Sequence, residues 1–194
     1  MQNIDLVLDH VRDHYLTGYI QRIAEYKKEF DPSSPEVLLE VGGREDQHLP
    51  YRLYRVDLAS GAVEPPNLTE FNHDSHLSFK PIDFKINNKL SGSLNAISWN
   101  GVEFDTICFD PNAKLLSDWA LKWIDIEESH TQNKYDLGGY VHSITYPKKT
   151  GEKCTFSVDF GSAEKESFYE LMDVFIALEI TELTVHSRTL HASP

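Results

Sequence analysis

The chain has 194 residues, of which 40% are hydrophobic and 25% charged, an ordinary composition for a protein with one hydrophobic core. Its 31 Asp and Glu outnumber its 18 Lys and Arg, so the formal net charge is −13. A negative field repels phosphate backbones and anionic lipids, which disfavours nucleic-acid and membrane-surface binding. The same field attracts basic partners, although it also serves solubility alone.

Cysteine usage and the lack of long apolar segments indicate a cytoplasmic protein. No run of about 18 apolar residues exists and no signal peptide is visible, so neither a membrane span nor secretion is expected. Cys108 and Cys154 are too few for a disulfide scaffold and lack the CxxC spacing of a zinc site. We therefore expect two reduced, buried cysteines and no cofactor.

The first thirty residues carry an amphipathic pattern. Apolar side chains recur every three or four positions, at Ile4, Leu8, Val11, Tyr15, Tyr19 and Ile23. This spacing predicts a helix over residues 1–30 that buries one face. Pro32 and Pro35 cannot continue the helix, so residues 31–35 are predicted to form a linker.

Residues 36–93 are predicted to form an irregular β region. Residues 37–41 form a short apolar strand closed by two glycines, and residues 51–58 alternate as a half-buried strand does. Residues 79–86 are predicted to be an edge strand, because a proline interrupts them. The pattern is weakest over residues 67–93.

Residues 94–128 are predicted to form a first ββα unit. Asn100-Gly101 lies between alternating runs and predicts a β-hairpin, because both central residues of such a turn take positive φ. Asp110-Pro111 is typical of a helix start, with a carboxylate N-cap followed by proline. The predicted apolar face of this helix consists of Leu115, Leu116, Trp119, Ala120, Trp123 and Ile126.

Residues 139–187 repeat this plan and add a final strand. Strands are predicted at residues 142–146 and 154–160, a helix after Gly161-Ser162, and the last strand at residues 182–186. The two units align either through duplication or because any two amphipathic ββα segments look alike. We therefore predict one α+β domain, an antiparallel sheet built from two ββα units and packed against helices on one face.

The common motifs of nucleotide binding and hydrolysis are missing, since the sequence has no GxGxxG, Walker A, HExxH or GxSxG pattern. Two histidine clusters remain. His73, Asp74 and His76 could ligate zinc or supply a general base, although these residue types are also typical of a turn. His10 and His14, one helical turn apart, could share a metal or lie on a solvated helix face.

The two predicted C-terminal helices carry an acidic stripe. Its members are Asp118 and Asp125 on the first helix and Glu166, Glu170 and Asp173 on the second. We expect Lys122 to pair with Asp118, and no cation to lie beside Glu166 and Glu170 on their helix face. Like charges four apart cost a helix a few tenths of a kcal/mol. An uncompensated pair therefore favours a role in binding, and the alternative is an ordinary solvated face.

Two aromatic residues are candidate interface anchors. Trp99, beside the predicted hairpin turn, and Tyr135 would each supply desolvated contact area if exposed. Trp119 and Trp123 lie four apart on an apolar helix face and are expected in the core.

These observations favour a non-enzymatic, acidic binding protein that engages a basic protein partner. In its small size, acidity and repeated ββα units, the chain resembles bacterial immunity and antitoxin-type proteins that neutralise a basic toxin. The resemblance is one of general profile, and it assigns no role to any residue. The alternative is a metal-assisted hydrolase that uses the His73, Asp74 and His76 cluster. The oligomeric state and the presence of a metal stay open.

Overall fold

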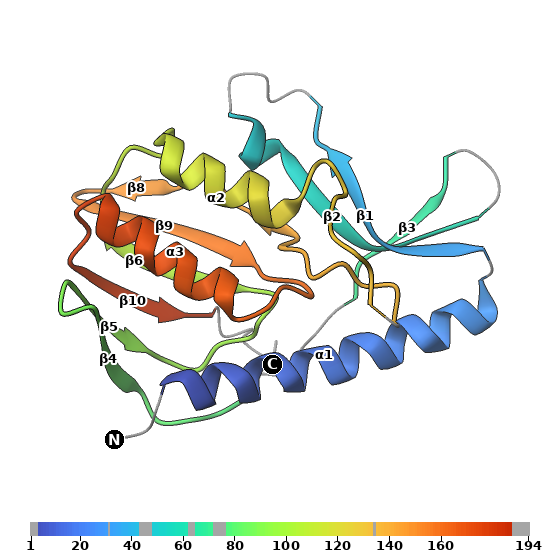
Figure 1. The fold of residues 1–194 in the computed structure, drawn as a ribbon, viewed down its shortest axis with the longest axis horizontal. Coiled ribbons are helices and arrows are strands. Elements are labelled where there is room, and N and C mark those ends of the chain that lie inside the picture. The colour runs from blue at the N-terminus through green and yellow to red at the C-terminus, as the bar shows by residue number, and fades with distance from the viewer. Residues whose placement is uncertain are drawn as a thin grey trace, which may run out of the picture.

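The computed structural model describes residues 4–30, 32–42, 48–61, 65–71, 77–133 and 135–187. Over these ranges it has three α-helices and a ten-stranded, mostly antiparallel sheet, which confirms the α+β class (Figure 1). The helices are α1 (Ile4–Glu29), α2 (Lys114–Ile124) and α3 (Glu166–Ala177), with a short 3-10 helix η1 (Leu49–Arg52). The strands are β1 (Ser33–Glu40), β2 (Leu53–Ser60), β3 (Asn67–Thr69), β4 (Ile82–Ile86), β5 (Leu90–Leu94), β6 (Val102–Ile107), β7 (Ser143–Ile144), β8 (Lys148–Thr150), β9 (Lys153–Asp159) and β10 (Glu182–His186). Of the helices described, none is long and apolar enough to cross a membrane.

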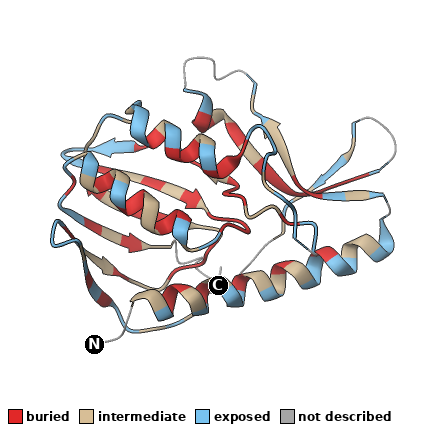
Figure 2. Cartoon of the chain, viewed as in Figure 1, coloured by how far each residue is buried: buried red, intermediate tan, exposed pale blue. Residues whose placement is uncertain are grey.

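One sheet extends through the molecule in the order β1-β2-β7-β9-β6-β10-β5-β4, with β3 beside β2 and β8 beside β9. The strand pairs are antiparallel except β5 and β10, which are parallel. α2 and α3 lie together over one face, and α1 runs the length of the molecule beside the sheet (Figure 1). The buried residues gather between these helices and the sheet (Figure 2). Aromatic rings fill much of this layer, at Phe104, Phe156, Phe160, Phe168 and Phe175.

The structure confirms the predicted N-terminal helix, but the predicted linker after it is wrong. α1 buries Val7, Leu8, Val11, Tyr15, Tyr19 and Ile23. Ser33, Ser34 and Pro35 are the first residues of β1 and pair with β2, so they do not form a linker. β1 is an edge strand, where a proline is tolerated because only one side of the strand is paired.

The hairpin predicted at Asn100-Gly101 is wrong. Residues 95–99 form no strand, and neither Asn100 nor Gly101 takes a positive φ. β6 pairs instead with β9 and β10. The paired positive φ angles, 49° and 54°, occur at Asn87 and Asn88 in the turn between β4 and β5. Tertiary pairing has therefore overridden the local turn signal.

The two predicted ββα units correspond in their second strand and in the helix that follows it. β6 leads into α2 and β9 leads into α3, while the first unit lacks its first strand. The predicted helix start at Asp110-Pro111 is wrong, since α2 begins at Lys114 with Ala113 as its N-cap, and the Asp110 carboxylate accepts a hydrogen bond from the Asn112 N–H in a turn before the helix. It ends at Ile124, which leaves Ile126 41% exposed, outside the predicted apolar face.

Candidate functional site

The predicted histidine clusters do not form a site among the residues that the structure describes. His73, Asp74 and His76 lie outside the described residues. His10 and His14 are exposed on α1. Across the described ranges, no group of three or more His, Cys, Asp or Glu side chains is arranged to hold a metal ion.

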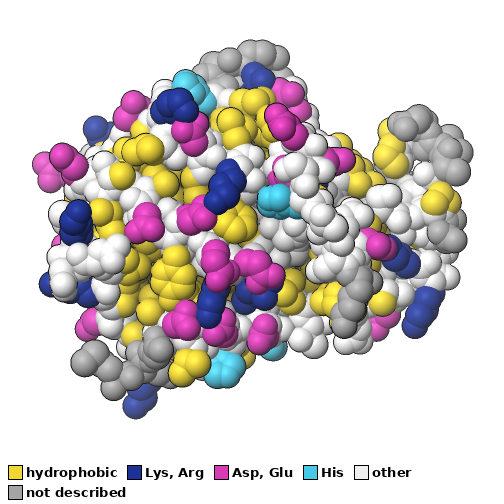
Figure 3. Space-filling view, viewed as in Figure 1, with side chains coloured by type: hydrophobic (Ala, Val, Ile, Leu, Met, Phe, Trp, Pro, Cys, Tyr) yellow, Lys and Arg dark blue, Asp and Glu magenta, His cyan; other side chains and the backbone are white. Residues whose placement is uncertain are grey.

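Ion pairs neutralise part of the acidic stripe. Lys114, rather than Lys122, pairs with Asp118 at 2.6 Å. Lys122 reaches from α2 to Glu170 on α3 at 2.7 Å, so the expectation of an uncompensated Glu170 is wrong. Burial alone would raise the pKa of Glu170, but Lys122 and the indole N–H of Trp123 hold it below its usual value. Lysines and carboxylates alternate over this face of the molecule (Figure 3).

Two predicted binding residues are buried, so a surface role is wrong for both. Trp99 is fully buried and stacks on Phe160, with ring centroids 4.7 Å apart. Asp125 is 5% exposed and ends α2 in a left-handed conformation. Its carboxylate accepts hydrogen bonds from the Ser129 hydroxyl and the His130 N–H, both at 2.8 Å. The three other candidates, Glu166, Asp173 and Tyr135, are exposed.

The densest cluster of titratable groups is buried, and the sequence did not predict it. His142 immediately precedes β7, is 1% exposed and lies against the Tyr19 ring of α1. Its Nε2 lies 3.0 Å from a carboxylate oxygen of Glu36. Its Nδ1 lies 3.4 Å from Asp57 and 4.0 Å from Asp159. Carboxylates from β1, β2 and β9 thus surround one imidazole.

Glu36 reaches the histidine through an unusual backbone conformation. Its φ is 52°, in the left-handed region that residues other than glycine rarely adopt. The ladder is interrupted there, since Pro35 and Val37 pair with β2 and Glu36 does not. The Glu36 carboxylate accepts a 2.9 Å hydrogen bond from the Gly138 N–H, and its carbonyl accepts a 2.6 Å bond from Arg55. This one residue therefore connects β1 with β2 and with the segment that leads to β7.

Burial and mutual repulsion shift the protonation of this cluster. Burial raises the pKa of Asp159 to about 7, with Asp57 adding to the shift and His142 opposing it. Burial alone would lower the pKa of His142, but the surrounding carboxylates raise it well above its ordinary value. A protonated His142 therefore lies beside an Asp159 carboxyl that titrates near neutral pH.

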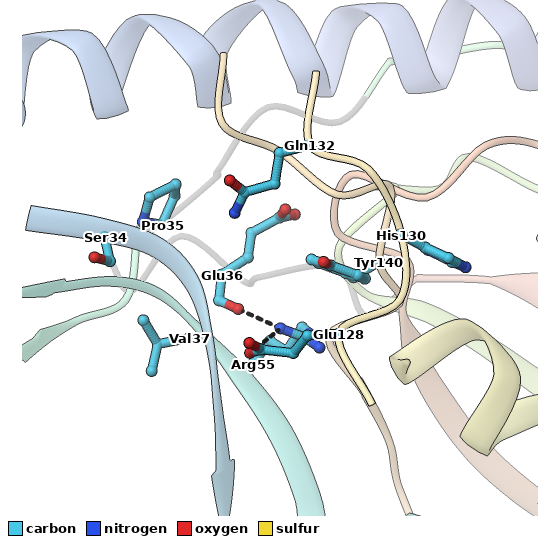
Figure 4. A pocket seen from close by; sticks show the side chains of 9 residues that line it. All are labelled: Ser34, Pro35, Glu36, Val37, Arg55, Glu128, His130, Gln132 and Tyr140. Carbon is cyan, nitrogen blue, oxygen red and sulfur yellow. Dashed lines mark hydrogen bonds and ion pairs between the residues drawn. The ribbon is translucent and has the colours of Figure 1, made fainter. Parts of the chain in front are cut away.

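A pocket of about 530 Å³ opens beside this cluster, between β1 and the loop that joins α2 to β7. It is lined by Ser34, Pro35, Glu36, Val37, Arg55, Glu128, His130, Gln132 and Tyr140. In Figure 4 the Glu36 side chain points from β1 toward the loop that carries Gln132 and Tyr140, and Glu128 lies beside Arg55. The pocket is therefore predominantly polar and contains two carboxylates.

Arg55 joins the elements that surround the pocket. Its guanidinium donates hydrogen bonds of 2.6 to 2.8 Å to the carbonyls of Glu36, Ile124 and Asp125. Its Cζ lies 3.7 Å from the centre of the Tyr140 ring, which also stacks on His130. Only 1% of the Arg55 side chain is exposed. The Arg55 side chain therefore holds β1, β2 and the end of α2 together.

Left-handed backbone is concentrated around the pocket and its loop. Of the seven non-glycine residues with positive φ in the described ranges, four belong here: Glu36, Asp125, Glu128 and Asp136. The Asn133 side chain fixes the loop by accepting hydrogen bonds from the N–H groups of Tyr135 and Leu137. Such conformations persist only where surrounding contacts enforce them, and they are common at functional sites.

Sequence reasoning missed this site because its members are far apart along the chain. The need for glycine at position 161, where an added Cβ would lie 2.1 Å from the His142 ring, becomes visible only in the fold. The chain matches no protein-family model, no curated protein and no solved structure. The geometry of the pocket and its loop is therefore the basis for assigning a function.

Proposed function

We propose that this chain is a non-enzymatic binding protein that engages a basic protein partner, with a Lys or Arg side chain of the partner entering the pocket between β1 and the α2–β7 loop. The proposal retains the partner chemistry expected from the net charge of −13. It moves the main contact away from the outer faces of α2 and α3, because Lys114 and Lys122 neutralise carboxylates there.

The charge balance of the pocket carries the proposal. Among its described lining residues there are two carboxylates, Glu36 and Glu128, and one Lys or Arg side chain, Arg55. Arg55 is buried and donates to backbone carbonyls, whereas the Glu128 side chain is 67% exposed and 3.8 Å from Arg55. Glu128 can therefore accept a second cation from the solvent side. Three carboxylates surround the one imidazolium of His142, so this buried cluster adds to the negative potential that such a cation would meet.

The loop beside the pocket has the composition of a binding surface. Ile126 is 41% exposed and Tyr135 is 40% exposed. The carboxylates of Glu127 and Glu128 stand close to Ile126 in the chain, and both residues are exposed. Exposed apolar and aromatic side chains beside charged ones are typical of interface anchors with a polar rim. Hydrogen bonds to the Asp125 and Asn133 side chains already order parts of the loop, which lowers the ordering cost of association.

The buried histidine supports binding over catalysis. His142 has the most strongly perturbed environment of the imidazoles in the described ranges, but it is 1% exposed. A general acid or base must reach within hydrogen-bond distance of its substrate. The contacts of His142 with Glu36 and Asp57 instead hold β1 and β2 against the segment before β7.

Titration with a fluorescent arginine-rich peptide at low ionic strength tests the proposal. We expect salt-sensitive binding, and a glutamate-rich peptide should not bind. Replacing both Glu127→Gln and Glu128→Gln should weaken binding about tenfold, the effect of losing roughly 1.4 kcal/mol. The matched control, Glu166→Gln with Asp173→Asn on α3, removes the same charge and should change affinity little. Equal weakening by the control pair would show that net charge and not the pocket sets the affinity, which would refute the pocket assignment.

Affinity capture from the native host, at low and then high ionic strength, tests the partner itself. The protein retained at low salt and released at high salt should have a basic isoelectric point. It should be lost when the Glu127→Gln, Glu128→Gln variant is the bait. An acidic partner, or one held equally well at high salt, would contradict the electrostatic proposal.

A further inference from the structure

We propose that Cys108 and Cys154 are a thiol-oxidation site that forms a reversible intramolecular disulfide. The two Sγ atoms lie 2.7 Å apart, and both cysteines are reduced in the structure. This separation exceeds the ~2.05 Å length of an S–S bond by about 0.7 Å. The inference does not depend on the proposed function, because it rests on the β6–β9 pairing alone.

The sheet brings the two sulfurs together. Thr106 and Ile107 of β6 pair with Cys154 and Lys153 of β9, and the Cys108 N–H continues the ladder with a 2.9 Å bond to the Glu152 carbonyl. Side chains two positions apart on a strand point to the same face. Cys108 and Cys154 are therefore diagonal neighbours on one face, and joining them needs side-chain movement rather than a new fold.

The two thiols are unequal in access. Cys154 is 4% exposed, whereas Cys108 is only partly buried. Burial, followed by the neighbouring Cys108 thiol, raises the pKa of Cys154. The thiolate is the reactive form of a cysteine, so Cys108 is the thiol that an oxidant meets and Cys154 is the resolving thiol.

The reaction with hydrogen peroxide balances in two steps. The Cys108 thiolate attacks one peroxide oxygen, the O–O bond breaks, and Cys108 becomes a sulfenic acid while hydroxide leaves and is protonated to water. The Cys154 sulfur then attacks the Cys108 sulfur, the S–O bond breaks and a second water leaves. The two thiols lose two electrons and two protons, and the peroxide is reduced to two waters. A dithiol reductant such as dithiothreitol reverses the bond by thiol–disulfide exchange.

The two cysteines are 46 positions apart, and the bond would enclose α2, the α2–β7 loop, β7 and β8. Closing a loop of this length restricts the unfolded chain and stabilises the fold. For a domain of this size, we expect oxidation to raise the Tm by roughly 10 °C, with the rise lost again on reduction.

Intact mass and thiol titration of the full chain test the inference. After treatment with hydrogen peroxide, the protein should lose two hydrogen atoms per chain and both titratable thiols, form no bond between chains, and recover both thiols with dithiothreitol. Peptide mapping should join the Cys108 and Cys154 peptides. The variants Cys108→Ser and Cys154→Ser should show neither the hydrogen loss nor the Tm rise. Two thiols that stay titratable in wild-type protein under excess oxidant, or oxidation that yields only dimers or oxygen adducts, would overturn it.

Discussion

Nε2 of His142 lies 3.0 Å from a carboxylate oxygen of Glu36, a residue 106 positions earlier whose backbone takes a left-handed conformation. The contact joins the edge strand β1 to the segment that enters β7, and His142 also lies against Tyr19 of α1. Because both groups are buried, each depends on the other for charge compensation. The stability of the fold should therefore be sensitive to either residue.

Replacing Glu36→Gln keeps the shape of the side chain and removes its charge. We expect the free energy of unfolding to fall by roughly 2–4 kcal/mol, because a buried imidazolium loses a charged partner. Urea denaturation measures the loss. Glu40→Gln on the same strand is the control, since Glu40 is exposed and its pair with Arg52 is worth about 1 kcal/mol or less. Equal losses in the two variants would contradict a special role for Glu36.

Stability should fall as pH rises from about 4 to above 7. The pKa of Asp159 is raised from 3.8 to about 7 by burial, so the folded chain holds a proton there that the unfolded chain releases. The raised pKa of His142 acts in the same direction above pH ~6.5. We expect the Tm to be several degrees higher at pH 6 than at pH 8. In the Asp159→Asn variant, the Tm difference between pH 6 and pH 8 should shrink. An unchanged difference would show that other groups control the pH dependence.

Gly161→Ala should destabilise the protein by roughly 3 kcal/mol or more. The new Cβ would lie 2.1 Å from the His142 ring, and the φ of 47° is unfavourable for alanine. Gly151→Ala is the matched control, because Gly151 has a φ of 65° and open space around its Cβ position. It should cost only the conformational term of about 1–2 kcal/mol. Similar Tm values for the two variants would mean that His142 can move aside.

Arg55→Lys should also be costly, although it conserves charge. A lysine ammonium cannot reproduce the planar fork that donates to the carbonyls of Glu36, Ile124 and Asp125, nor stack on Tyr140. Buried carbonyls left without donors predict a loss of roughly 2–4 kcal/mol. Arg52→Lys, which keeps a surface pair with Glu40, should cost less than about 1 kcal/mol. Both losses are measurable by chemical denaturation, and a tolerated Arg55→Lys would contradict the joining role of this side chain.

The elements that sequence reasoning predicted well are those whose signal is local. α1 and α3 have apolar side chains at helical spacing, and β9 alternates between buried and half-buried residues, so each pattern survives in the fold. The hairpin at Asn100-Gly101 failed for the opposite reason, since β10 occupies the place beside β6 that the predicted partner strand would have needed. A strand distant in sequence outweighed a nearby turn signal.

The candidate site was beyond sequence reasoning because nothing local marks it. Glu36 has an ordinary neighbourhood in the chain, and its left-handed backbone depends on Gly138, Arg55 and His142. Trp99 and Asp125 were misplaced in a similar way, since a turn residue and a helix-end carboxylate are usually exposed. Their burial depends on Phe160 and on the α2–β7 loop, which no spacing rule could supply.

The position of β10 has a consequence for how the protein is made. β10 is the last of the described strands in chain order, yet it lies between β5 and β6 and pairs with both. Until residues 182–186 have left the ribosome, the β4–β5 hairpin has no neighbour to join it to the rest of the sheet. Assembly of the whole sheet should therefore wait until residues 182–186 have been synthesised, and until then the nascent chain must keep two incomplete half-sheets from pairing wrongly.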